Sequence, residues 1–224
     1  MTMPRLLALT AHPDDAEITM GATLASCVAS GWDVTVAVFT SSSARIRQAA
    51  EAAAAIIGHR LVWVDDGARA WVEDYRDTEL VALVDSLVAE HRPDVVISHW
   101  SGDPHRDHAR LSAAALAAMR RTHATLYALP PSEFRSPAYD AFTANIVVDV
   151  SDYLEVKERA LAEFQYEGWA WQQVDTPTLL TLAHATGARM GWRAAETFAL
   201  IRQVGLTGSA AGNALSNPVD SEQR

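Results

Sequence analysis

Residues 11–17 place a histidine and two adjacent carboxylates within one short polar stretch. His12 supplies an imidazole nitrogen, and Asp14 and Asp15 supply carboxylate oxygens. Nitrogen and oxygen ligands suit zinc or iron(II), and a carboxylate held near the ion but not on it can take a proton from water. Taken alone, the same residues also fit a turn in which an aspartate caps the next helix.

A second polar stretch, residues 99–108, is rich in the same ligand types. Its imidazoles and carboxylates are His99, Asp103, His105, Asp107 and His108. Each of the two stretches follows an apolar run typical of a buried strand and precedes a run with helical spacing. In open α/β sheets, ligands bind where the carboxyl ends of the parallel strands meet. We therefore predict a single metal site built from both stretches.

The elements that must position these residues alternate along the chain. Apolar runs predict strands at residues 6–9, 33–40, 61–64, 94–98, 126–129 and 146–150. Helical spacing predicts helices at residues 18–30, 45–57, 78–91, 109–121, 153–166 and 178–188. Residues 134–142 fit an irregular segment, and residues 198–204 fit a late strand or a docking segment. Successive strand–helix units with short connections predict an α/β fold: a doubly wound, Rossmann-like, mostly parallel sheet with helices on both faces.

Length and composition set further bounds. The 224 residues suit a single domain, expected over residues 1–204, followed by a disordered tail at residues 205–224 where small and charged residues predominate. A net charge of −10 argues against a nucleic-acid partner. No apolar stretch reaches the roughly 18–20 residues of a membrane span. Cys27 is the single cysteine, so no internal disulfide forms. With no signal-peptide pattern at the start, a cytoplasmic enzyme is the expectation.

The two stretches together resemble the motifs of the PIG-L/LmbE-like deacetylases, metal-dependent N-deacetylases of acetylated amino sugars and related conjugates. Residues 11–17 match the first motif and residues 105–108 the second. Supporting matches lie at residues 20–23, 99–103 and 195–198. The similarity covers roughly residues 4–202, and it implies the same Rossmann-like fold and a small N-acetylated, sugar-like substrate. Relatives are often homo-oligomers, so self-association is an open expectation.

Carried over position by position, the resemblance implies that His12, Asp15 and His108 bind the metal. The ion is expected to be Zn²⁺, with Fe²⁺ or another divalent metal also compatible. Three protein ligands leave a fourth position open, as a hydrolytic zinc site requires. His99 is expected to support the site from a strand end rather than to act as a ligand.

The resemblance also implies roles for three residues in catalysis. Asp14 would be the general base and His105 the second catalytic group, with Asp107 pairing with His105. A neighbouring Asp107 carboxylate would raise the pKa of His105 and keep it cationic, so that it stabilises the oxyanion. Asp107 could instead cap the helix that follows. Either His105 or Asp14 would protonate the leaving amine.

Substrate contacts are expected from an arginine and from aromatic side chains. In the family, an arginine at the start of the second helix often reaches the substrate, and Arg47 or Arg45 occupies that place. The aromatic candidates for lining a sugar pocket are Trp71, Tyr75, Trp100, Trp169 and Trp171. Among these we select Trp100, although most tryptophans are partly buried packing residues.

The chain departs from the family pattern outside the metal-binding motifs. The loop at residues 40–47 is shorter than in many members, and Phe164 and Glu167 stand where members often have a histidine and a glutamine. Thr19 and Met20 also differ from the commoner glycine-containing form. These departures bear on the substrate and leave the reaction type unchanged.

The favoured function is therefore zinc-dependent removal of an acetyl group from an N-acetyl amino sugar or a sugar-containing metabolite by metal-activated water. One alternative is an amidase that cleaves a larger amide, such as a thiol conjugate. A different class is a catalytically silent homologue that only binds a metal or a sugar. A nucleotide-binding module is disfavoured because the first strand–helix turn lacks the glycine-rich phosphate motifs.

Overall fold

The computed structural model describes residues 3–41, 43–164 and 174–204, and within these residues seven strands form one sheet. The order across the sheet is β3-β2-β1-β4-β5-β7-β6. The strands are β1 (Arg5–Thr10), β2 (Asp33–Val38), β3 (Arg60–Trp63), β4 (Val95–His99), β5 (Thr125–Leu129), β6 (Ile146–Asp149) and β7 (Ala195–Arg202). Strands β1 to β5 pair in parallel, and β7 is antiparallel to both of its neighbours.

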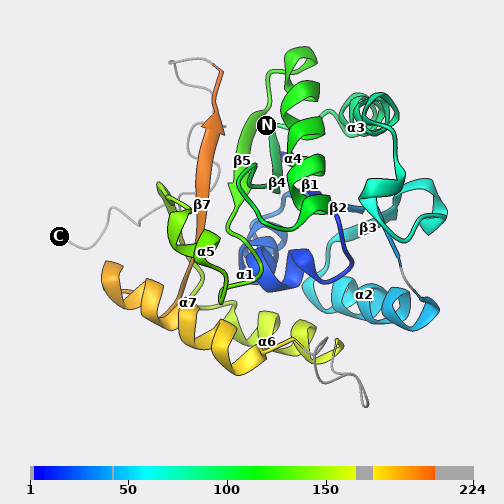
Figure 1. Ribbon diagram of the computed structural model, residues 1–224. Coiled ribbons are helices and arrows are strands. Elements are labelled where there is room, and N and C mark those ends of the chain that lie inside the picture. The colour runs from blue at the N-terminus through cyan, green and yellow to red at the C-terminus, as the bar shows by residue number, and fades with distance from the viewer. Residues whose placement is uncertain (1–2, 42, 165–173, 205–224) are drawn as a thin grey trace.

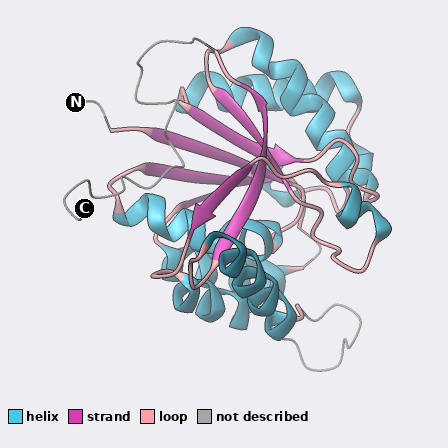
Figure 2. Cartoon of the chain, turned by 90° about the vertical axis from the view of Figure 1, so that its left-hand side faces the viewer, coloured by secondary structure: helices cyan, strands magenta, loops and turns pink. Residues whose placement is uncertain are grey.

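Helices cover both faces of the sheet (Figures 1 and 2). On one face lie α1 (Asp15–Ala29), α2 (Ala44–Ile57), α6 (Leu154–Ala162) and α7 (Thr176–Met190). On the other face lie α3 (Asp77–His91) and α4 (Arg106–Ala118). The short helix α5 (Pro137–Ala141) and the 3-10 turns η1 (Val64–Gly67), η2 (Val72–Asp74) and η3 (Met119–Arg121) complete the connections. The layers are those of a doubly wound α/β domain, as predicted.

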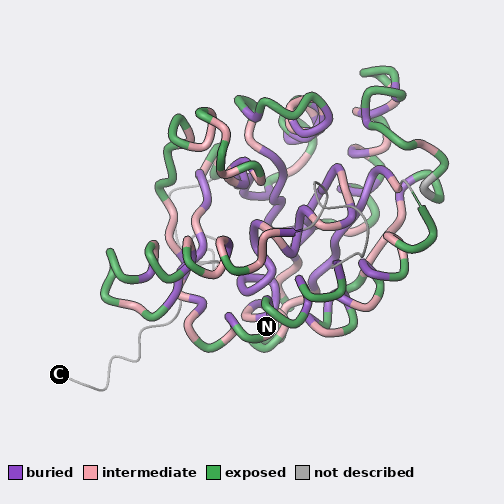
Figure 3. Tube along the Cα trace, turned by 60° about the horizontal axis from the view of Figure 1, so that its bottom comes forward, coloured by how far each residue is buried: buried purple, intermediate pink, exposed green. Residues whose placement is uncertain are grey.

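The strand β1 shows why its sequence reads as an unbroken apolar run. Leu6 and Ala8 contribute to the core beneath α1, α2, α6 and α7, whereas Leu7 and Leu9 contribute to the core beneath α3 and α4. Successive side chains of a strand point to opposite faces, so a strand covered on both faces must be apolar at every position. Figure 3 shows the same arrangement, with the buried trace in the middle and the exposed trace around it.

Several element boundaries differ from the predicted ones. Helices α1 and α4 each begin three residues earlier than the apolar spacing indicates, because their first turns carry polar and charged side chains that break the apolar pattern. Residues 134–142, predicted to be irregular, include the short helix α5. The predicted helix at residues 153–166 ends at Ala162 in α6, and residues 165–173 lie outside the described part of the chain.

The late segment at residues 198–204 belongs to a strand and is not a docking segment. Strand β7 begins earlier, at Ala195, and lies between β5 and β6 rather than at an edge of the sheet. The predicted tail at residues 205–224 lies outside the described residues. Among the helices that the structure describes, none has the length and apolar character needed to cross a bilayer.

The strand order creates a switch point between β1 and β4. From β1 the chain continues through β2 to β3 on one side, and from β4 it continues to β5 on the other side. The loops that leave the carboxyl ends of β1 and β4 therefore diverge and leave a crevice between them, which is where doubly wound folds bind their ligands. Residues 11–14 and 100–105 form these two loops.

Candidate metal centre

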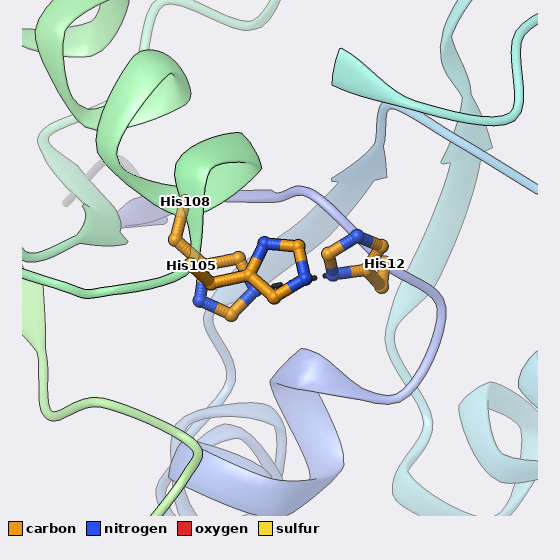
Figure 4. Close-up of side chains that lie close together, drawn as sticks. All are labelled: His12, His105 and His108. Atoms are coloured by element: carbon orange, nitrogen blue, oxygen red, sulfur yellow. Dashed lines mark hydrogen bonds between the residues drawn. The ribbon is translucent and has the colours of Figure 1, made fainter. Parts of the chain in front are cut away.

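Three histidines from the two loops face one another at the switch point (Figure 4). His12 lies on the loop after β1, His105 lies just before α4, and His108 lies in the first turn of α4. Among the described side chains, two overlapping groups could hold an ion: His12 with His105 and His108, and Asp15 with His99 and His108. The two polar stretches predicted to form one site are therefore brought together.

The predicted ligands His12, Asp15 and His108 are in mutual contact. His12 Nδ1 lies 3.1 Å from His108 Nε2. Asp15 approaches the two imidazoles with different oxygens: Oδ1 lies 3.3 Å from His108 Nε2, and Oδ2 lies 3.5 Å from His12 Nδ1. At a tetrahedral zinc ion with bonds near 2.0–2.1 Å, neighbouring ligand atoms lie about 3.3 Å apart. The donor types, two imidazole nitrogens and a carboxylate, and their separations are compatible with a divalent ion.

Two carboxylates hold the far nitrogens of these imidazoles. Asp103 Oδ2 lies 2.9 Å from His108 Nδ1, and Asp107 Oδ2 lies 3.2 Å from His12 Nε2. In each pair the carboxylate accepts the imidazole N–H, so that the other ring nitrogen is the one available to a metal. The second oxygen of each carboxylate accepts a backbone N–H, from His105 at 2.8 Å and from Glu73 at 2.9 Å. The orientations of both imidazoles are thereby fixed.

The expected pairing of Asp107 with His105 is wrong. Asp107 contacts His12, and it does not cap α4 because the residue at the N-cap position is His105. The pKa of His105 is lowered, not raised: burial and the positive charges of His108 and His12 outweigh the attraction of Asp107. His105 is therefore a neutral, exposed imidazole at neutral pH.

His99 has a supporting position at the end of β4. Its Nε2 accepts the N–H of Ala11 at 3.0 Å, and its ring stacks on His108 with the centroids 3.9 Å apart. Burial and the charge of His108 lower the pKa of His99 to about 4, so the ring is neutral. Although His99 is close enough to Asp15 and His108 to join a metal group, the lone pair of Nε2 is already engaged. This agrees with the expected role behind the site.

The charges of the site favour a cation at the imidazole nitrogens. Burial acts to lower the pKa of His12, but Asp15 and Asp107 raise it to about 10. His108 behaves alike: burial lowers its pKa, but Asp15 and Asp103 raise it to about 9. The facing nitrogens of His12 and His108, at 3.1 Å, have room for one shared proton between them. A field that attracts a proton to this point attracts a metal ion to it as well.

The adjacent carboxylates Asp14 and Asp15 are driven in opposite directions. Burial alone would raise the pKa of Asp15, yet His108, His99 and His12 hold it well below its usual value, so Asp15 stays ionised. Burial and the charge of Asp15 raise the pKa of Asp14. Asp14 occupies the N-cap position of α1 but makes no side-chain capping bond. Its carboxylate is thus free to act on a proton.

The two residues predicted to touch substrate have structural contacts of their own. Arg47 Nη1 donates to the carbonyl oxygen of Asp66 at 2.6 Å, and its guanidinium lies 4.5 Å from the centroid of the Trp63 ring. Trp100 lies edge-on to Phe142, with ring centroids 5.6 Å apart. No contact places either residue in the metal group, so their substrate roles stay predictions.

The other aromatic candidates fall into separate environments. Tyr75 is a core residue whose hydroxyl donates to the Phe39 carbonyl, whereas Trp71 is 56% exposed. Trp169 and Trp171 lie outside the described residues, as does Glu167. Phe164 is a buried core residue.

The sequence reasoning missed the role of Asp103 and the burial of Glu17. Asp103 was visible as a member of the second polar stretch, but nothing in its spacing shows that it faces His108. Glu17 is only 2% exposed, and burial together with the charges of Asp14 and Asp15 raises its pKa to about 8. A carboxylate in the first turn of a helix is usually a solvated residue, so the sequence carried no sign of this burial.

The half of the chain that carries both metal-site loops matches a known protein family. A family model described as "PIG-L: GlcNAc-PI de-N-acetylase" matches residues 7–119, half of the chain, and this span contains both metal-site loops. The chain belongs to the PIG-L family. The match confirms the family resemblance seen in the two motifs. It also confirms the predicted class of enzyme, a hydrolase of amide bonds.

Two curated relatives are similar to this chain over most of their lengths. A 1D-myo-inositol 2-acetamido-2-deoxy-α-D-glucopyranoside deacetylase of Actinosynnema mirum is 28% identical, covering 75% of this chain and 82% of the relative. A diacetylchitobiose deacetylase of Thermococcus kodakarensis is 27% identical, covering 86% and 81%. Both relatives are named as deacetylases of acetylated sugars.

A solved structure extends the comparison of the fold. The 4-carboxy-2-hydroxymuconate hydratase GalB of Pseudomonas putida superposes with a TM-score of 0.73 at 18% identity, covering 93% of this chain and 100% of the hydratase. This likeness shows the fold alone, and it shows that the fold common to these proteins carries more than one reaction.

Proposed function

We propose that this PIG-L family protein is a zinc-dependent N-deacetylase that hydrolyses the acetamide of an N-acetyl amino sugar or of a sugar-containing metabolite. The observation that carries the proposal is the convergence of His12, Asp15 and His108, with separations of 3.1–3.5 Å, beside the raised-pKa carboxyl of Asp14. A metal site with an adjacent base is the equipment that amide hydrolysis by water needs.

The ligands proposed for the ion are His12, Asp15 and His108. When bound, a divalent ion supplies a Lewis acid that lowers the pKa of water and stabilises negative charge. The chain contributes the orientation of these ligands, because Asp103 and Asp107 fix which ring nitrogen of each imidazole is unprotonated.

Asp14 is the proposed general base. It accepts a proton from the water that attacks the acetamide carbonyl carbon, and it then donates this proton to the amine nitrogen as the carbon–nitrogen bond breaks. The products are the amine and acetic acid, which at neutral pH become the ammonium and acetate. The water oxygen forms the new carbon–oxygen bond, one water proton reaches the amine nitrogen through Asp14, and the other stays on the new carboxyl group until it ionises. Its raised pKa, caused by burial and by Asp15, brings Asp14 nearer to the working range of such a base.

His105 is proposed to donate an N–H hydrogen bond to the developing oxyanion as a neutral imidazole. Its ring is exposed and lies 4.7 Å from the His12 ring and 4.6 Å from the His108 ring, measured between centroids. A neutral donor can stabilise an oxyanion without first carrying a charge. The neutral state of His105 also makes Asp14 the better donor of the proton for the leaving amine.

The substrate class follows from the relatives. Both curated relatives are named for an acetylated glucosamine unit, one attached to inositol and one in a disaccharide. We propose a substrate with an N-acetylglucosamine unit, with Arg47 and Trp100 as residues that contact the remainder of the molecule. The alternative function, an amidase that cleaves a larger amide such as a thiol conjugate, would act on a substrate with a larger group next to the scissile bond.

The test is an assay of acetate release from a panel of N-acetylglucosamine compounds. The panel contains the free sugar, a disaccharide, and inositol-linked, nucleotide-linked and thiol-linked derivatives. The enzyme is stripped with a chelator and then reloaded with Zn²⁺ or Fe²⁺. We expect acetate release from at least one N-acetyl sugar, lost on stripping and restored by reloading. Reloaded protein that binds the metal but releases acetate from no member of the panel would contradict the proposal.

A further inference from the structure

Helix α1, which begins at the metal site, is broken at Met20, and an ion pair fills the break. The Met20 backbone has φ −143° and ψ 15°, outside the helical region. In a regular helix the N–H of residue 22 would pair with the C=O of residue 18. Here the Ala22 N–H donates to Glu196 Oε1 at 3.3 Å, and the Ile18 carbonyl accepts from Lys157 Nζ at 2.9 Å.

Lys157 and Glu196 also bind each other. Lys157 Nζ lies 2.6 Å from Glu196 Oε1, and the two side chains are 4% and 3% exposed. A chain of contacts therefore runs from the Ile18 carbonyl through the ammonium and the carboxylate to the Ala22 N–H, in place of one backbone hydrogen bond. The other oxygen, Glu196 Oε2, accepts the Thr23 N–H at 2.8 Å. Glu196 thus caps the second half of α1, where the helix dipole favours a negative charge.

The pair comes from distant parts of the chain. Lys157 belongs to α6 and Glu196 to β7. Gly21, next to the break, lets the lysine approach: a Cβ at this position would lie 3.4 Å from Lys157 Cγ. The two supporting sequence matches at residues 20–23 and 195–198, which the metal site itself does not use, are therefore in contact with each other.

The turn on the near side of the break carries Asp14 and Asp15. Because the helix is interrupted, the direction of this turn is not set by the rest of α1 alone. We propose that Lys157 and Glu196 are positioning residues: by holding Ile18 to Ala22 across the break, they fix the first turn of α1 and so place both aspartates against the two imidazoles. A broken helix held by inserted side chains is a recognised cause of a stable kink.

The experiment compares Lys157→Met, Glu196→Gln and the double variant with the wild type. Zn²⁺ dissociation constants come from competition with a chromophoric chelator, and ligand geometry comes from the visible spectrum of Co²⁺-loaded protein. We expect each single variant to bind Zn²⁺ about tenfold or more weakly, as for other residues that orient ligands. The double variant, which leaves no uncompensated buried charge, should recover thermal stability relative to the single variants but not Zn²⁺ affinity.

Arg202→Met is the matched control. Arg202 is a cation on the same strand, β7, and it donates to the carbonyl oxygens of Met119 and Thr122 at the opposite edge of the sheet. Its replacement should lower Tm while Zn²⁺ affinity and the Co²⁺ spectrum stay unchanged. If the Lys157 and Glu196 variants behave like this control, the pair is only structural and the proposal is overturned.

A measurement of turnover in these variants rests on the proposed deacetylase function, whereas the measurements of Zn²⁺ affinity and of the Co²⁺ spectrum do not. On an active N-acetyl sugar we expect kcat to fall about tenfold or more, with KM within about threefold of the wild type. A wild type that binds Zn²⁺ without turnover contradicts the deacetylase proposal alone. If the neutral variants do not fold, Lys157→Arg and Glu196→Asp keep both charges and carry the test: wild-type Zn²⁺ affinity in both overturns the proposal.

Discussion

Asp103→Asn is the most direct probe of how the site orients its ligands. Asp103 uses one oxygen for the His105 N–H at 2.8 Å and the other for His108 Nδ1 at 2.9 Å. An asparagine has one acceptor oxygen and one NH₂ group. If its oxygen keeps the His105 N–H, its NH₂ group faces His108 Nδ1. The imidazole proton must then move to Nε2, the nitrogen that should face the metal.

The size of the effect follows from this conflict of tautomers. Loss of a carboxylate behind a metal-ligating histidine typically lowers metal affinity 10–100-fold, or about 1.4–2.7 kcal/mol. Asp103→Asn should fall at the upper end, because the change forces the wrong tautomer as well as removing a charge. Asp107→Asn should act in the same way on His12, because Asp107 divides its oxygens between the Glu73 N–H and His12 Nε2.

The assay is a Zn²⁺ competition titration at constant pH, with thermal melts of the metal-free proteins. Asp175→Asn is the matched control: Asp175 also accepts a backbone N–H, from Thr178, but its second oxygen faces Arg135 and not a histidine. Asparagine is as good an N-cap as aspartate, so this variant should keep both Tm and Zn²⁺ affinity. Wild-type Zn²⁺ affinity in Asp103→Asn would refute the reasoning.

Three further predictions concern the proposed base, the protonation of the imidazoles and the packing of a glycine. Asp14→Asn should retain the metal while kcat falls by a factor of about 10²–10⁴, whereas His12→Ala should lose the metal. Measuring metal content and turnover for both variants separates the two effects. Normal turnover in Asp14→Asn would contradict the role of Asp14 as the base. Because the one proton shared between His12 Nδ1 and His108 Nε2 competes with the metal, and the pKa values of these imidazoles are raised, apparent Zn²⁺ affinity should rise about tenfold per pH unit between pH 7 and 9. A Zn²⁺ affinity that is flat over this interval rules out the competition. Gly187→Ala should lower stability by about 1–3 kcal/mol or more, because its Cβ would lie 2.6 Å from the Ala194 backbone; an unchanged denaturation midpoint is the contrary result.

The fold and the convergence of the two polar stretches were predictable because they depend on short-range patterns. The apolar run of β1 and the histidine and aspartates after it are neighbours in sequence, and strand–helix alternation implies that β1 and β4 end at the same edge. The resemblance of the two motifs then implied His12, Asp15 and His108 as the ligand set, which remains a proposal.

The orientation of the supporting carboxylates could not be predicted in this way. Asp107 lies two residues from His105 in the sequence, which favours a local pairing, but the start of α4 directs its side chain to His12, 95 residues away. The partner of Asp103 likewise depends on where the first turn of α4 begins. Local spacing does not determine such a rotation, because the position of a helix start is uncertain by one or two residues.

The break in α1 was also hidden from the sequence. Residues 20–23 contain a glycine, which permits a break, but the contacts that stabilise it come from α6 and β7 through long-range packing. The pairing of β7 with β5 and β6 is of the same kind. An eight-residue strand with mixed exposure gives no sign of its neighbours or its direction.

The place of β7 has a consequence for how the molecule is assembled. Within the part of the chain that the structure describes, strand β6 joins the sheet only through β7, so its partner strand is not present until residues 195–202 have been made. During synthesis the parallel half, β1 to β5, can form first, whereas β6 must wait for the later strand to arrive beside β5. The same late strand delivers Glu196 to α1. A nascent chain that stops short of it would hold every proposed metal ligand and still lack the support that aligns them.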